Sequence, residues 1–83
     1  MDNAYKHRLD QAFFSIIMLK PELQRDLKRM WNNAANINKE ISQEQVNCRR
    51  LGKDTVQLKE LQAKLGEALD HLESYLTFAS LLT

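Results

Sequence analysis

A seven-residue apolar repeat is the feature of this chain that most limits its fold. Between residues 21 and 51 a 4-3 spacing selects Leu23, Leu27, Met30, Ala34, Ile37, Ile41, Glu44, Cys48 and Leu51, and only Glu44 is not apolar. Between 55 and 82 it selects Leu58, Leu61, Leu65, Ala68, Leu72, Tyr75, Ala79 and Leu82. Such repeats place apolar side chains along one stripe of a helix and favour left-handed packing against a second helix. The two segments therefore predict an antiparallel, coiled-coil-like helical hairpin.

Few residues interrupt this pattern, and they predict where the helices begin and end. Pro21 suits the first turn of a helix and pushes the residue before it out of helical conformation. Gly52 is a natural C-terminal stop, and Asp54 or Thr55 can cap the next helix. No segment alternates apolar and polar residues as a half-buried strand does. We expect an all-α domain over 1–83, with helices at about 3–19, 21–51 and 55–82.

The lengths of these helices predict how they are arranged. At about 1.5 Å per residue, the two long helices reach about 40 to 45 Å and the first helix only about 25 Å. The short helix can therefore cover only half of the hairpin. Because Pro21 makes a tight connection, the covered half should hold the start of the helix 21–51 and the end of the helix 55–82.

The segment AFFSIIML, residues 12–19, has more apolar side chains than one packed helix face requires. Phe14 and Met18 lie about 100° around the helix from the stripe expected to pack on the hairpin. A surplus aromatic and methionine surface on a small protein is typical of an interface. The stripe expected to pack is, for example, Leu9, Phe13, and Ile16 or Ile17, with Lys20 closing it.

The end of the chain adds to this surplus, because Leu69, Leu76, Phe78 and Leu81 lie outside the repeat. We expect them to widen the apolar face where the short helix arrives. Trp31 lies at the edge of the stripe in the helix 21–51, and it either packs against the first helix or serves as a binding anchor. The candidate partner-binding residues are Phe14, Met18, Trp31, Leu76, Phe78 and Leu81.

Charge is segregated along the chain although the total is only +1. Residues 20–53 carry eight basic and four acidic side chains, whereas residues 54–83 carry two basic and five acidic ones. Part of the basic charge can therefore be paired within the molecule. The alternative is a basic and amide-rich face that contacts phosphates. The possible nucleic-acid face comprises Arg25, Lys28, Arg29 and Asn32.

No motif in the chain indicates catalysis, a cofactor or a metal ion. Cys48 is the only cysteine, which excludes an internal disulfide and a cysteine-based metal site within one chain. His7 and His71 lack a recognised ligand spacing such as HExxH, and no serine has a readable base. No stretch reaches the ~20 apolar residues of a membrane span, and no signal peptide is readable. We expect a cytoplasmic protein that is not an enzyme and does not enter a membrane.

Residues 52–82 resemble the C-terminal part of the small co-chaperones of type III secretion needle subunits. The residues that carry the resemblance are Gly52, Gln57, Gln62, Leu69 and Leu76. In that family a short turn leads to a glutamine-containing helix that packs on its neighbour in a hairpin. The resemblance implies that the chain docks on a larger helical-repeat chaperone and helps to keep a needle subunit unpolymerised.

Three functional hypotheses follow from the sequence. The first is a helical protein–protein interaction module that acts as an adaptor, inhibitor or accessory subunit through the surface where the first helix meets the end of the third. The second is an accessory protein that binds nucleic acid through the basic face of the helix 21–51. The third is a structural protein that associates with copies of itself.

Overall fold

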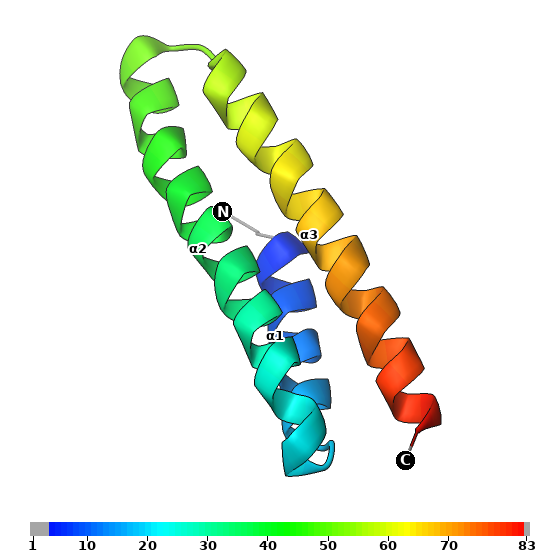
Figure 1. Ribbon diagram of the computed structural model, residues 1–83. Helices are drawn as coiled ribbons and strands as arrows, with labels where there is room; N and C mark the ends of the chain where they lie inside the picture. The colour runs from blue at the N-terminus through cyan, green and yellow to red at the C-terminus, as the bar shows by residue number, and fades with distance from the viewer. Residues whose placement is uncertain (1–3, 83) are drawn as a thin grey trace.

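The computed structural model describes residues 4–82, which form three helices joined by two short connections (Figure 1). Helix α1 spans Ala4–Ile17, α2 spans Pro21–Leu51 and α3 spans Val56–Leu81. The molecule is elongated, with extents of 48 × 18 × 17 Å. Helices α2 and α3 form an antiparallel hairpin, and α1 lies beside the half that holds the start of α2 and the end of α3 (Figure 1). The predicted all-α fold with a short helix on a long hairpin is confirmed.

The connection between α1 and α2 lies directly before Pro21, as predicted. Lys20 is extended, with φ −61° and ψ 144°, as expected for a residue before proline. The N–H of Leu19 donates to the carbonyl of Ile16 at 3.0 Å, and Gln24 Nε2 donates to the Leu19 carbonyl at 2.7 Å. Helix α1 therefore ends two residues before the predicted position 19. The predicted first residue, Asn3, lies outside the described range.

The connection between α2 and α3 confirms the predicted stop at Gly52. This glycine adopts the left-handed conformation, with φ 73° and ψ 20°, which a residue with a Cβ rarely adopts. The N–H groups of Gly52 and Lys53 both donate to the carbonyl of Cys48, at 2.8 and 3.1 Å. Two peptide donors thus satisfy a carbonyl that the end of the helix leaves unpaired.

Thr55 caps the N-terminus of α3 and also binds Glu44, the one polar residue in the apolar repeat of α2. Its Oγ1 accepts a hydrogen bond from the N–H of Leu58 at 3.1 Å, and its hydroxyl donates to Oε2 of Glu44. The thiol of the buried Cys48 adds a third contact, because Sγ accepts the N–H of Thr55 at 3.4 Å. The carboxylate of Glu44 therefore joins the two helices at the tip of the hairpin.

Replacing Thr55 with alanine is expected to lower the free energy of unfolding by about 1 kcal/mol, the usual cost of losing an N-cap side chain. The change removes the acceptor of the Leu58 N–H and the donor to Glu44 together. Urea denaturation followed by circular dichroism measures the loss. Thr55→Ser keeps the hydroxyl and is the matched control, with a much smaller effect. An alanine variant as stable as the serine variant would show that the cap contributes nothing.

The core of α1 differs from the predicted stripe. Its buried residues are Leu9, Ala12 and Ile16, with Tyr5 and Leu19 partly buried beside them. Leu9 and Ile16 are buried as predicted, with Ile16 rather than Ile17 the correct one of the two alternatives, and Lys20 is exposed at the end of the stripe. Phe13 is 39% exposed, so its place in the buried stripe was wrong. Ala12 is buried instead, in the cluster with Leu27 and Leu72, because the face of α1 that meets the hairpin runs through Leu9, Ala12 and Ile16, at spacings of three and four residues. Phe13 then packs at the edge of the interface.

The core of α3 departs from the seven-residue repeat halfway along the helix. The buried residues are Leu58, Leu61, Leu65, Leu69, Leu72, Leu76 and Ala79. From Leu58 to Leu69 the step is eleven residues, which rotates the apolar stripe relative to a strict seven-residue repeat. The rotation lets α3 contact α1 as well as α2. Tyr75, predicted in the stripe, is therefore exposed, as are Leu51 and Leu82 at the helix ends.

Candidate docking surfaces

The outer face of α1 carries the first exposed apolar surface. Phe14 follows the buried Ala12 by two residues, which places it about 200° around the helix, away from the hairpin. Its side chain is 65% exposed, and that of Met18 is 74% exposed. We call this surface, made of Phe14, Ile17 and Met18, the α1 outer face. The structure places Phe14 and Met18 where a partner can reach them.

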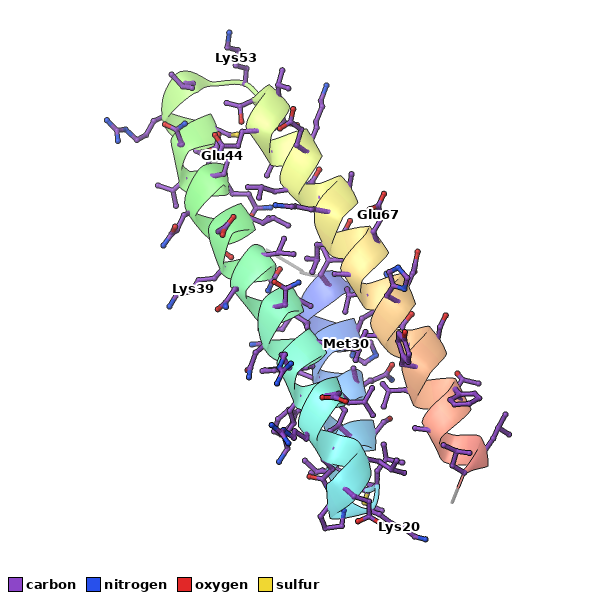
Figure 2. The ribbon with its side chains drawn as sticks, in the orientation of Figure 1. Lys20, Met30, Lys39, Glu44, Lys53 and Glu67 are labelled. Atoms are coloured by element: carbon purple, nitrogen blue, oxygen red, sulfur yellow. The ribbon has the colours of Figure 1, made fainter. Side chains whose placement is uncertain are left out.

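The second apolar surface is a groove between the start of α2 and the end of α3. It has a volume of about 620 Å³, and no residue of α1 lines it. Its floor includes the buried Leu27 and Ala79. Figure 2 shows Met30 on the side of α2 that faces α3. We call this the α2–α3 groove, with its apolar lining formed by Leu23, Met30, Tyr75, Phe78 and Leu82.

Two of the six predicted partner-binding residues lie against or within the core instead. Leu76 is only 8% exposed and belongs to the cluster formed with Ile16 and Leu72, so it widens the face that α1 covers, as expected, and little of its surface is left for a partner. Trp31 is partly buried, its Nε1 donates to the carbonyl of Leu9 at 2.7 Å, and its ring lies 5.0 Å from that of Phe13. Trp31 thus packs against α1, which was the first of its two predicted alternatives.

The remaining predicted residues do not form one surface. Phe78 is 60% exposed and lines the α2–α3 groove, to which α1 contributes nothing. Leu81 is 80% exposed at the end of α3. The sequence missed the groove because Leu23, Met30 and Tyr75 were all assigned to the seam of the hairpin. The groove could have been predicted from the position of these three residues, which lie in the half of the hairpin that α1 covers. A single third helix can cover only one side of the seam there, so the other side stays open.

A polar clamp fixes α1 against α3. Arg8 donates from Nε and Nη2 to the two carboxylate oxygens of Glu73, at 3.0 and 2.7 Å, and from Nη2 to Asp70 at 3.0 Å. The bonds to Glu73, followed by that to Asp70, raise the pKa of the guanidinium above its ordinary value, because they favour its charged form. The arginine is about one-third exposed, which limits the contribution of the pairs to stability.

The proposed nucleic-acid face lies in solvent. Arg25, Lys28, Arg29 and Asn32 are all exposed on α2. Within residues 4–82, the three cations form no ion pair with the acidic residues of α3. The prediction that the acidic helix would pair with part of this basic charge therefore does not hold for these three residues. Their charge is available for a partner.

Polar and charged residues line most of the groove at the hairpin tip. This open groove has a volume of about 560 Å³, and Gln45, Arg49 and Asp54 are among the residues that line it. In the range 4–82 no three His, Cys, Asp or Glu side chains come together as a metal site would require. Within the same range, none of the helices combines the length and apolar character needed to cross a membrane.

Comparisons of the chain with protein-family models, with curated proteins and with solved structures found no match. The residues that carry the resemblance to the secretion co-chaperones have mainly structural positions. Gly52 forms the turn, and Leu69 and Leu76 are buried. Gln57 is exposed and Gln62 is half-buried. A turn glycine and two core leucines are what any helical hairpin of this length requires.

Proposed function

We propose that this chain is a non-enzymatic helical interaction module that binds another protein through the apolar surfaces at its α1 end. The observation that carries the proposal is where the exposed apolar side chains lie. Most of them belong to the half of the molecule that contains α1, in two groups on either side of the hairpin. They are Phe13, Phe14, Ile17, Met18, Tyr75, Phe78, Leu81 and Leu82.

The contrast with the hairpin tip supports this assignment. At the tip the exposed large apolar residues are Val46, Leu51 and Val56, which are aliphatic and are flanked in the sequence mainly by polar residues. Exposed single aliphatic residues are common on protein surfaces, whereas clustered aromatic and methionine side chains are enriched at interfaces. The α1 end is therefore the part of the surface best suited to a protein partner.

Affinity capture with surface variants tests the proposal. The tagged chain, Phe14→Glu and Phe78→Glu would be used to capture proteins from cells that express it, with quantitative mass spectrometry. We expect at least one variant to lose a captured protein by about tenfold or more, as for a hot-spot aromatic residue. Val56→Glu is the matched control, since it adds the same charge at an exposed tip position where a helix N-terminus tolerates it.

Two further measurements complete this test. Circular dichroism must show that each variant keeps the wild-type helix content, because both replaced side chains are exposed. Light scattering over a wide concentration range separates a different partner from a second copy of the chain. A captured set that is the same for wild type, Phe14→Glu and Phe78→Glu would contradict the proposal.

Nucleic-acid binding is the second candidate function, and the unpaired cations of α2 are the observation that favours it. It predicts a gel shift with random oligonucleotides at low salt, which weakens as salt rises and when Arg25 and Arg29 are replaced by glutamate. Absence of a shift at low salt would remove this candidate. The apolar lining of the α2–α3 groove favours a protein partner, because an apolar surface makes no favourable contact with a charged phosphate group.

The identity of the partner and the compartment belong to the same proposal. A helical-repeat chaperone that holds a secretion needle subunit is the partner class that the resemblance over residues 52–82 implies. A cytoplasmic location is supported by the single cysteine, Cys48, whose thiol is buried at the hairpin tip.

A further inference from the structure

We propose that the α2–α3 groove binds an amphipathic helix with basic flanks from a partner protein, as a fourth helix beside α2 and α3. This inference rests on the proposed interaction function and assigns it a surface and a partner chemistry. The geometry of the hairpin is its first support. Helix α1 covers one side of the seam between α2 and α3, and the groove lies where α1 contributes no residue. A fourth helix would cover the seam from this open side.

The groove has the length of a helix of several turns. Its apolar part ends at His71, which also lines a smaller groove of about 450 Å³ that continues toward the tip beside Glu40 and Lys64. From Glu22 to Glu40 is 18 residues along α2, or about 27 Å at 1.5 Å per residue. A partner helix of about 18 residues matches this length.

The walls of the groove favour a helix over an extended peptide. They are two helices, and within residues 4–82 the chain has no strand whose edge could pair with an extended segment. Tyr75, Phe78 and Leu82 follow one another at spacings of three and four, which is the spacing that meets the apolar face of a helix. Met30, on the opposite wall, offers a flexible side chain that adapts to such a face.

Charge at the groove selects the partner. Glu22 and Asp26 line the apolar part, and Glu40 and Glu67 line its continuation, whereas Lys64 is the only lysine or arginine in either lining. Lysine or arginine on the flanks of a partner helix would complement these carboxylates. A second copy of the chain docked through the same groove would instead bring like charges together, because a two-fold interface pairs each surface with itself. Phosphate groups would be repelled for the same reason.

Two synthetic peptides test the inference with the full chain. Each is an 18-residue helix with leucines at i, i+3, i+4 and i+7 spacing, one with lysine and one with glutamate on the flanks, and each carries a fluorophore for anisotropy titration. We expect the lysine peptide to bind about tenfold more tightly than the glutamate peptide. The double variant Glu22→Lys with Asp26→Lys should reverse this preference.

Single variants of the chain show which surface the peptide binds. Phe78→Ser should weaken binding of the lysine peptide by about tenfold, whereas Val56→Ser at the distant tip should leave it unchanged. Circular dichroism confirms that every variant is folded. Equal binding of the two peptides, or no binding of either, would overturn the inference. Loss of binding in Phe14→Ser but not in Phe78→Ser would also overturn it, since the peptide would then lie on the α1 outer face.

The outcomes separate this inference from the function on which it rests. Capture of a protein that Phe14→Glu loses and Phe78→Glu retains would keep the interaction function while overturning the groove as its site. A captured set unaffected by either variant would contradict the function itself, whatever the peptides do. A dimer in light scattering that Phe78→Glu converts to a monomer would make a second copy the occupant of the groove and would overturn the basic partner.

Discussion

Replacing Leu72 with alanine is expected to lower the free energy of unfolding by about 3 kcal/mol. Leu72 is 0% exposed and lies in a cluster to which all three helices contribute. Its neighbours there include Ile16 of α1 and Leu27 of α2, so the cavity left by alanine would open toward both helices. A chain of this length has a total stability of roughly 4 to 12 kcal/mol, so the loss is a large share of it.

Urea denaturation followed by far-UV circular dichroism measures this loss. Leu81→Ala is the matched control, since it removes the same atoms from a side chain that is 80% exposed. We expect the control to change the free energy of unfolding by about 0.5 kcal/mol or less. Equal effects of the two substitutions would show that Leu72 does not lie in a packed core.

Replacing Trp31 with alanine is expected to lower the free energy of unfolding by about 3 kcal/mol as well, for a different reason. Trp31 packs against both buried clusters, so its indole joins the cluster that extends toward the tip to the cluster at the other end of the molecule. It also holds α1 directly, through the hydrogen bond to the Leu9 carbonyl and the tilted contact with Phe13. Alanine would remove all of these contacts at once.

Trp31→Phe separates the hydrogen bond from the packing. Phenylalanine keeps an aromatic ring but has no N–H donor, so a loss of about 1 kcal/mol is expected, compared with about 3 kcal/mol for alanine. Urea denaturation followed by circular dichroism gives both values, because the variants lack the only tryptophan of the chain. A phenylalanine variant that is as unstable as the alanine variant would assign the whole effect to the hydrogen bond.

The ends of the helices could be predicted from the sequence because local chemistry determines them. Pro21 excludes helical conformation from the residue before it, Gly52 supplies a left-handed conformation and Thr55 supplies a side-chain acceptor. Each effect acts within a few residues and needs no knowledge of the tertiary structure. The order and the relative placement of the helices followed from their lengths.

The buried faces were predicted less well because they depend on which helices meet. A strict seven-residue repeat assumes one partner helix, whereas α3 packs against two, so Leu69 and Leu76 replace Ala68 and Tyr75 in the core. In α1, ranking residues by apolar character selects Phe13, although the smaller Ala12 is the buried residue. The space available between the packed helices decides which side chain is buried at this position, and a pattern of apolar residues does not give that space.

The candidate site could be predicted only in part for the same reason. Exposed aromatic and methionine residues were expected, and Phe14, Met18, Phe78 and Leu81 are exposed. Their division between two sides of the hairpin depends on where α1 lies. The groove joins residues from the start of α2 to residues from the end of α3, such as Leu23 and Leu82, which are far apart in the sequence. No local pattern connects them.

The clamp between Arg8 and α3 has a consequence for the folding kinetics. Helices α1 and α2, and then α2 and α3, are joined by connections of a few residues, and chains with mostly local contacts fold within microseconds to milliseconds. The ion pairs of Arg8 join residues 62 and 65 positions apart, so they form only after both connections have closed. Contacts that form this late act on the rate of unfolding rather than on the rate of folding. The modest stability that the clamp adds is therefore expected to slow unfolding more than it speeds folding.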